Sequence, residues 1–197
     1  MDSEKNLGDE EFISIMGASE NEETAHENNI SDGYIIIHEE RIPFGRKAVF
    51  DGKMSVIIPE TFELMPEETA AVKYPSAERP DFIYTNEETT VNFSLAHKDG
   101  KAANEDIPGV KDMIQEFVAK MHPASAVIDS EVIEVSGKNI AYFDFVAPAI
   151  DTEVYNMMFV FSLEGRLAIG SFNCPIDDME DWKPVFVQMM QSIEQEG

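Results

Sequence analysis

The sequence predicts an α+β fold, in which a largely antiparallel β-sheet carries helices on both faces. Two observations support this prediction. Apolar, β-branched stretches alternate with short connections that contain glycine, and such connections join antiparallel neighbours because a parallel pairing needs a crossover of a dozen or more residues. In addition, two segments repeat apolar residues at the spacing of a single helical stripe.

The strands begin at Tyr34, where the segment "YIIIHEERIPF" is apolar and β-branched. The following "GRKAVF" meets Asp51-Gly52 before "KMSVIIP", which is the pattern of two strands around a tight turn. Three further dipeptides predict turns between neighbouring strands: Asp99-Gly100, Ser136-Gly137 and Glu164-Gly165.

Burial patterns differ between the predicted strands. The segment "TVNFSLA" alternates apolar and polar residues from Val91, which predicts that one face of this strand is wet or thinly covered. By contrast, "YNMMFVFSL" is apolar at almost every position, as expected for a central strand that is covered on both sides.

Two longer helices follow from apolar residues at relative positions 0, 3, 4, 7, 8 and 11. The first stripe comprises Val110, Met113, Ile114, Phe117, Val118 and Met121, and the second comprises Trp182, Val185, Phe186, Met189, Met190 and Ile193. We expect both stripes to pack on the sheet, with Met113, Met121, Met189 and Met190 filling the core. Asp106 can cap the first helix, and a shorter third helix is predicted from Pro66 to Lys73.

The charge is unevenly distributed along the chain. Residues 1–40 carry 12 acidic side chains and one basic side chain, and residues 1–32 contain few aromatic residues and no sustained period. We therefore expect residues 1–32 to form an acidic, disordered leader and residues 33–197 to form a single domain. The apolar patch "FISIM" at 12–16 is either a short docking motif or part of this frayed leader.

Composition excludes several classes of function. A net charge of −25 disfavours nucleic acid and anionic membrane surfaces as ligands, because both would repel the protein, and favours a cationic or apolar protein partner. The longest apolar run, "MMFVF", is far shorter than a membrane-crossing helix. With one cysteine and no signal-peptide pattern, a cytoplasmic location is expected.

The stretch "GSFNCPIDDMEDW" holds the single cysteine, Cys174, and the single tryptophan, Trp182. The acidic residues between them would raise the pKa of a thiol, which argues against a nucleophile and for a join between a buried strand and a helix. The helix start is predicted either at Asp177, with Glu180 completing a capping box, or at Asp181, with Pro184 in the first turn.

No catalytic, metal or cofactor site is predicted. The four histidines show no spacing that suits zinc, and the usual nucleotide-binding and hydrolase motifs do not occur. Asp144 interrupts the apolar segment "YFDFV" and is expected either to face solvent or to be buried and paired, for instance with Arg166 or Lys138.

Taken in order, the segments "GKMSVIIPETFELM", "KYPSAERPDFIYTNE" and "GSFNCP", with the closing helix, resemble the Mog1/PsbP-like superfamily and its small bacterial members over residues 41–192. The resemblance implies an α-β-α sandwich with a curved antiparallel sheet flanked by helices. It also implies a non-enzymatic role, since this superfamily includes a nuclear-transport factor that binds a small GTPase, a photosynthetic subunit and bacterial chaperones that shield hydrophobic segments.

The favoured hypothesis is therefore a non-enzymatic adaptor or chaperone-like protein that holds a protein partner or an exposed apolar segment on the concave face of the sheet. Polar groups that interrupt apolar strand patterns are the candidate partner-binding residues: Tyr84, Asn86, Asn92 and Asn156. Two alternatives are a small thiol-dependent hydrolase that uses Cys174, and an acidic mimic of nucleic acid that inhibits a basic protein.

Overall fold

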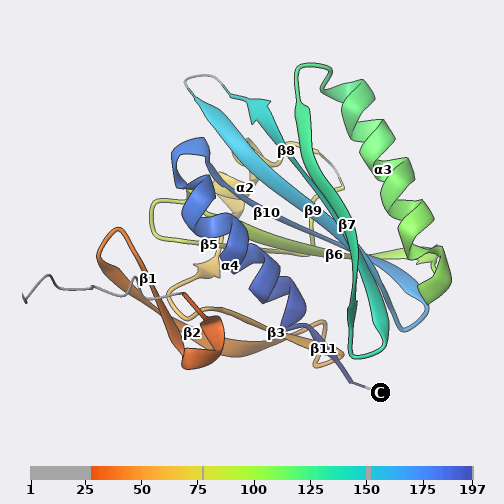
Figure 1. Cartoon of the computed structure of the whole chain (residues 1–197), viewed down its shortest axis with the longest axis horizontal. Helices are drawn as coiled ribbons and strands as arrows, with labels where there is room; N and C mark the ends of the chain where they lie inside the picture. Colours follow the sequence, from red (N-terminus) through yellow and green to blue (C-terminus); the bar gives the residue numbers. More distant parts are fainter. Residues whose placement is uncertain (1–27, 77, 150–151, 197) are drawn as a thin grey trace, which may run out of the picture.

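The computed structural model describes residues 28–76, 78–149 and 152–196. Their strands form two antiparallel sheets (Figure 1). The small sheet has the order β1-β2-β3-β11, with bounds Tyr34–Ile37, Glu40–Val49, Met54–Pro59 and Glu194–Gln195. The large sheet has the order β4-β5-β6-β10-β9-β8-β7. Its strands are β4 (Glu63–Leu64), β5 (Phe82–Thr85), β6 (Asn92–Lys101), β7 (Ala126–Val135), β8 (Lys138–Pro148), β9 (Glu153–Leu163) and β10 (Arg166–Pro175).

In the described residues, three α-helices accompany the sheets: α2 (Glu67–Lys73), α3 (Ile107–Met121) and α4 (Met179–Gln191). Helix α3 contacts β8 and β9, whereas α4 contacts β10 of the large sheet and β3 of the small one. In Figure 1 the green α3 therefore lies against the large sheet alone, and the blue α4 lies between the two sheets. The predicted α+β fold with a curved antiparallel sheet and flanking helices is confirmed.

Most of the predicted hairpin turns are present. Asp51 and Gly52, Ser136 and Gly137, and Glu164 and Gly165 all have positive φ, as tight hairpin turns require. The prediction at Asp99-Gly100 is wrong, because β6 continues through both residues and pairs Lys101 with Arg166. A further turn at His38 and Glu39, which also have positive φ, divides the first apolar segment into β1 and β2.

The main core lies between the large sheet, α4 and the small sheet. An aromatic series crosses it: the ring centroid of Phe172 lies 4.8 Å from that of Phe93 and 4.7 Å from that of Phe186. Gly170 makes room for this series, because a Cβ at that position would lie 2.0 Å from the Phe159 ring. Trp182 and Cys174 are both buried in the same core, as the predicted strand-to-helix join requires.

The two apolar stripes have different outcomes. In the second stripe the five helical residues Trp182, Val185, Phe186, Met189 and Met190 are buried, and so is Ile193 just beyond the helix. In α3, however, Met113, Phe117 and Met121 are 73%, 63% and 61% exposed. The prediction that Met113 and Met121 fill the core is therefore wrong, because the sheet-facing side of α3 is instead built from Ile107, Ile114 and the buried Lys111.

The helix starts also differ in detail from the predictions. Asp106 precedes α3 without making a side-chain cap; its carboxylate accepts a hydrogen bond from the backbone N–H of Ala103. A 3-10 turn, Ile176–Asp178, leads into α4 at Met179, so Pro184 lies inside the helix and Asp181 lies in its first turn. Neither predicted cap of α4 forms, whereas α2 occupies the predicted segment after Pro66.

Part of the predicted leader belongs to the folded domain. Asn28 exchanges two hydrogen bonds with the backbone of Ile36, and Ile30 is buried in the main core. The backbone N–H of Ile30 also donates to Gln188 of α4. Residues 28–32 are thus packed on the domain, while the rest of the predicted leader, with its "FISIM" patch, lies outside the described residues.

Candidate binding cleft

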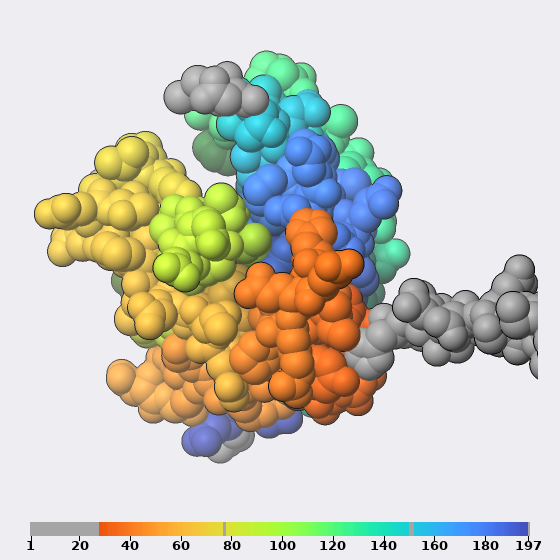
Figure 2. Space-filling view, turned by 90° about the vertical axis from the view of Figure 1, so that its left-hand side faces the viewer, coloured from red at the N-terminus to blue at the C-terminus, as the bar shows by residue number. Residues whose placement is uncertain are grey.

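The large sheet carries a cleft on the face opposite the main core. Its volume is about 710 Å³. Lys73 and Tyr74 at the end of α2 and Thr89 and Thr90 before β6 form one side, and the ends of β8 and β9 form the other. Figure 2 shows this hollow between the yellow α2 segment and the cyan end of β8 and β9.

Three asparagines from three strands, Asn92, Asn156 and Asn173, form part of the lining. Because side chains alternate along a strand, Asn173 points to the cleft face while its neighbours Phe172 and Cys174 point into the main core. Asn92 and Asn173 are directly opposite each other in the ladder between β6 and β10.

A chain of hydrogen bonds fixes these amides. Thr85 Oγ1 donates to Asn92 Oδ1 at 2.7 Å, Asn92 Nδ2 donates to Asn173 Oδ1 at 2.8 Å, and Asn173 Nδ2 donates to the Tyr74 hydroxyl at 3.3 Å. Next to it, the hydroxyls of Ser94 and Ser171 lie 2.8 Å apart. Since most of these groups are at least half buried and mutually bonded, they hold the lining rigid.

The side formed by α2 is tied to the turn before β6. Lys73 Nζ donates to the backbone oxygen of Thr89 and, at 2.9 Å, to its Oγ1. Partial burial lowers the pKa of Lys73. Burial also raises the pKa of Tyr74, against a smaller opposite effect of the hydrogen bond from Asn173, so the hydroxyl stays protonated at neutral pH.

Two polar atoms of the lining retain free bonding capacity. Asn156 Nδ2 donates to the Val154 carbonyl, but no described residue donates to its Oδ1. The Tyr74 hydroxyl accepts from Asn173, and its own proton has no acceptor among the described residues. These two groups offer an acceptor and a donor, alongside apolar surface from Ala149, Val154 and Pro175.

The structure brings two of the four predicted site residues together, because Asn92 and Asn156 both line this cleft, but Asn92 is only 4% exposed, so the expectation of an exposed side chain is wrong for it. Asn86 instead stabilises the turn before β6: its Oδ1 accepts from the backbone N–H groups of Thr90 and Val91 at 2.8 and 2.9 Å. It lines a neighbouring pocket of about 440 Å³ with residues of β4.

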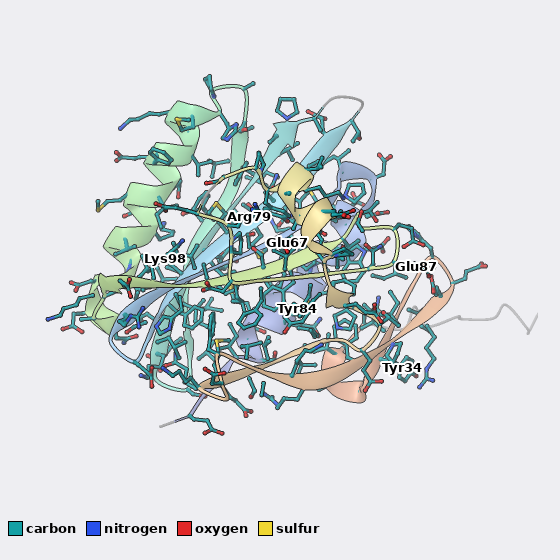
Figure 3. The ribbon with its side chains drawn as sticks, turned by 180° about the vertical axis from the view of Figure 1, so that it is seen from behind. Tyr34, Glu67, Arg79, Tyr84, Glu87 and Lys98 are labelled. Carbon is teal, nitrogen blue, oxygen red and sulfur yellow. The ribbon has the colours of Figure 1, made fainter. Side chains whose placement is uncertain are left out.

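Tyr84 lies on the other face of the sheet and is only 4% exposed, so the expectation that it belongs to an exposed face is wrong (Figure 3). Its ring stacks near that of Phe93, and Lys47 Nζ lies 4.5 Å from its centroid. Sequence reasoning missed Tyr74 and Asn173. The signal for Asn173 was present, since it is the polar residue between Phe172 and Cys174 in an alternating strand.

Cys174 contributes no accessible sulfur to the cleft. Its side chain is fully buried among core residues, and burial, with a smaller effect of Asp178, raises the pKa of the thiol to about 12. A nucleophilic cysteine requires an accessible thiolate and a partner base. This environment supports the predicted structural role and gives no support to a thiol-dependent hydrolase.

Asp144 is buried on the core face of β8 and is paired, but with neither partner suggested by the sequence. Its Oδ2 lies 2.7 Å from Lys183 Nζ of α4 and accepts a hydrogen bond of 2.7 Å from the Tyr155 hydroxyl. Arg166 instead pairs with Asp99. Sequence spacing gave no indication of Lys183, because it reaches β8 from a helix far along the chain.

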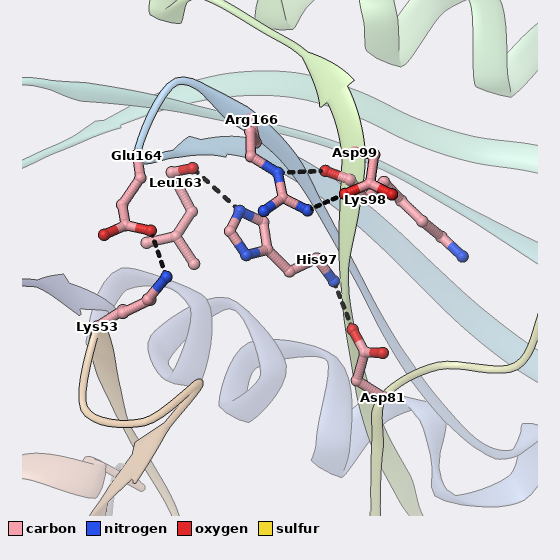
Figure 4. Close-up of polar contacts among 8 residues, drawn as sticks. All are labelled: Lys53, Asp81, His97, Lys98, Asp99, Leu163, Glu164 and Arg166. Atoms are coloured by element: carbon pink, nitrogen blue, oxygen red, sulfur yellow. Dashed lines mark hydrogen bonds and ion pairs between the residues drawn. The ribbon is translucent and has the colours of Figure 1, made fainter.

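A second polar cluster lies at the opposite end of β6 (Figure 4). His97 Nε2 lies 3.1 Å from the Leu163 carbonyl, Arg166 bonds the Lys98 carbonyl and Asp99, and Lys53 pairs with Glu164 at 2.7 Å. The pair with Lys53 lowers the pKa of Glu164. These contacts join the turns of the β2–β3 and β9–β10 hairpins to strand β6, so we interpret the cluster as structural.

Within the described ranges, no group of three or more His, Cys, Asp or Glu residues is arranged to hold a metal ion. In the same part of the chain, none of the helices has the length and apolar character needed to cross a membrane.

No protein-family model and no curated protein matches the chain. Solved structures do. Cyanobacterial PsbP from Synechocystis aligns with a TM-score of 0.58 at 13% identity, covering 78% of this chain and 92% of that one. The Ran-binding protein Mog1p from Saccharomyces cerevisiae aligns with a TM-score of 0.53 at 10% identity, covering 78% and 96%. A protein from Bacteroides thetaiotaomicron aligns with a TM-score of 0.52 at 11% identity, covering 77% of this chain and 48% of that one.

These similarities define the fold: the chain has the Mog1/PsbP-like fold, as the sequence predicted. At such low identities they define the fold alone. One neighbour of this fold, the yeast protein, is a Ran-binding protein.

Proposed function

We propose that this protein is a non-enzymatic adaptor or chaperone-like protein, which holds an extended segment of a protein partner in the cleft between α2 and the ends of β8 and β9. The observation that carries this proposal is the cleft itself, with a rigid, hydrogen-bonded lining and neighbouring apolar surface. Asn156 remains a predicted partner-binding residue, and Tyr74 and Asn173 join it, whereas the 4% exposed Asn92 acts only through its hydrogen bond to Asn173.

The chemistry of the lining suits a polypeptide. The free Oδ1 of Asn156 can accept from a backbone N–H, and the Tyr74 hydroxyl can donate to a backbone carbonyl. Apolar side chains of the same segment would contact Val154 and Pro175. An apolar segment with exposed backbone groups therefore fits better than a highly charged ligand.

The yeast neighbour of the same fold is itself a Ran-binding protein, which agrees with a protein-binding role but identifies no partner for this chain. We also propose a cytoplasmic location and no binding to nucleic acid, on the grounds of the single cysteine and the net charge of −25. An acidic mimic that inhibits a basic protein would use the outer surface and not the cleft.

The test places a photo-activated crosslinking residue at Asn156, inside the cleft, and, in a control, at the exposed Ala48 on the small sheet. We expect a crosslinked protein partner from Asn156 and none from Ala48. The purified partner should then bind the Asn156→Trp variant at least about tenfold more weakly, a loss of about 1.4 kcal/mol, because the indole fills the cleft.

The variant Ala48→Trp serves as the binding control, and thermal unfolding confirms that both variants fold. Equal crosslinking from the two positions, or unchanged affinity of Asn156→Trp, would contradict the cleft as the binding site.

A further inference from the structure

The last strand of the large sheet has a free edge. Strand β7 (Ala126–Val135) pairs with β8 on one side, and no strand in the described ranges pairs with its other side. At ten residues it is long for an edge strand, and most of its side chains are exposed. Unpaired backbone groups along such an edge can accept another strand.

The direction of the free backbone groups follows from Ser130. Its backbone N–H donates to the neighbouring Asp129 Oδ1 at 2.9 Å, so it points away from β8. In an antiparallel ladder, residues whose N–H and C=O groups face the partner alternate with residues whose groups face away. The N–H groups of Val132 and Glu134 therefore also point to the free edge.

The exposed surface of β7 combines apolar and acidic side chains. Val127, Ile128 and Val132 are 41%, 50% and 45% exposed. Asp129, Glu131 and Glu134 are interspersed with them, and the strand contains no Lys, Arg or His.

The register assigns these side chains to the two faces of the sheet. Asp129 and Glu131 lie opposite Asp144 and Tyr142, on the face that carries α4. Val127 and Val132 lie opposite Phe145 and Ala141, on the face that carries α3. Between Val127 and Val132, a strand added to the edge would meet carboxylates on one face and valines on the other, whereas Glu134 lies further along on the valine face.

Pairing with a second copy of β7 is disfavoured by charge. Two such strands would bring their carboxylates together with no basic residue between them, and each chain carries a net charge of −25. Lys183 lies 3.7 Å from Asp129 and more closely bonds Asp144, so it offsets only part of this charge. The complementary strand is therefore basic.

We propose that the free edge of β7 binds an extended segment of a partner protein by strand addition, and that this segment alternates Lys or Arg with β-branched apolar residues. The basic side chains pair with Asp129 and Glu131, and the apolar side chains pack beside Val127 and Val132. This surface is separate from the cleft, so the inference does not depend on the proposed function.

The test uses a fluorescein-labelled decapeptide of alternating Val and Lys, titrated with the full chain by fluorescence anisotropy. We expect saturable binding that weakens at least about tenfold for Val132→Pro, because proline removes an outward N–H while an edge position tolerates it. The control variant Asn156→Trp, in the cleft, should bind the peptide as the unaltered protein does.

Two further peptides separate strand addition from simple charge attraction. A block peptide of five Val followed by five Lys keeps the composition, and an alternating peptide with N-methyl groups at every second residue keeps the charge but removes edge hydrogen bonds. Both should bind at least about tenfold more weakly to the unaltered protein. The N-methyl comparison tests the proposal even where Val132→Pro does not fold.

Equal binding of all three peptides, or no binding of the alternating peptide, would overturn the proposal. So would analytical ultracentrifugation that shows a dimer dissociated by Val132→Pro, because the edge would then pair with a second copy of this chain.

Discussion

Helices α3 and α4 carry apolar residues at the same relative positions, yet their surroundings differ. In α4 every helical member of the stripe is buried, from Trp182 to Met190. In α3 three members, Met113, Phe117 and Met121, are exposed. The stripes therefore predict helices equally well, but they do not predict what covers them.

The difference comes from the number of layers that each helix contacts. Helix α4 lies between two sheets, so its flanks as well as its inner face are covered. Helix α3 lies on one sheet and contacts β8 and β9, so it buries only the narrow face around Ile107 and Ile114. Stripes at the same relative positions are therefore covered to different extents by one sheet and by two.

The same asymmetry separates core from candidate binding surface. The α4 face of the large sheet is an aromatic core, whereas its other face is covered in part by α2 and α3 and holds the cleft between α2 and the ends of β8 and β9. The asparagines of the cleft lie on this less covered face.

The largest expected effect compares one phenylalanine from each stripe. Phe186→Ala should lower the free energy of unfolding by about 3–5 kcal/mol, because it leaves a cavity beside Phe172 and Trp182 in the core. Phe117→Ala should change it by less than about 0.5 kcal/mol, because this side chain is exposed. Urea unfolding followed by circular dichroism measures both.

Similar losses for the two variants would mean that α3 is covered in solution as α4 is. The comparison also bears on binding: if Phe117→Ala left stability unchanged but weakened partner capture, the uncovered row of α3 would become part of the binding surface.

Local patterns predicted much of the fold. Turns with glycine, such as Ser136-Gly137, were found because positive φ favours that residue, whereas the turn at His38 and Glu39 carries no such signal. The hairpin of β2 and β3 was predicted, but its place in a second sheet was not, because the pairing of β3 with β11 joins residues far apart in sequence. That sheet decides which apolar stripe is buried.

The candidate site was only partly predictable. Polar interruptions of apolar strands indicated Asn92 and Asn156, which share the cleft. The same rule failed for Tyr84, which is buried. It failed because a tyrosine ring can occupy a core position as well as a surface position. Tyr74 follows a helix and has no strand period, so its place in the cleft depends on tertiary packing alone.

The next largest effect concerns a lysine from each helix. Lys183→Met should cost about 2 kcal/mol, because it leaves the buried Asp144 carboxylate without its cation; the loss is below the usual 3–5 kcal/mol since Lys183 is 27% exposed. Adding Asp144→Asn to this variant should restore part of the stability. Chemical denaturation of the two single variants and the double variant gives the coupling energy.

Lys120→Met in α3 is the matched control, because this lysine forms an exposed pair with Glu116 at 3.7 Å. It should change stability by less than about 0.5 kcal/mol. Equal losses of stability for the two lysine variants would contradict the expectation that the ion pair of α4 stabilises the fold more than the exposed ion pair of α3.

The smallest effect is a pH dependence of stability. It distinguishes the core face of β10, which carries Cys174, from the cleft face, which carries Asn173. Because burial raises the pKa of Cys174 to about 12, the thiol stays protonated in the folded state while it ionises in the unfolded state above its ordinary value of 9.0. Its contribution to stability is therefore full below pH 9 and declines as the pH rises toward 12, by about 1.4 kcal/mol at pH 10. The variant Cys174→Ala should lack this decline, so the difference between its pH profile and that of the unaltered protein isolates the thiol from tyrosine and lysine titration.

Iodoacetamide should label Cys174 of the unaltered protein at pH 8 only as fast as the protein unfolds. Rapid labelling, together with identical pH profiles, would place the sulfur on the accessible cleft face beside Asn173 instead of in the core.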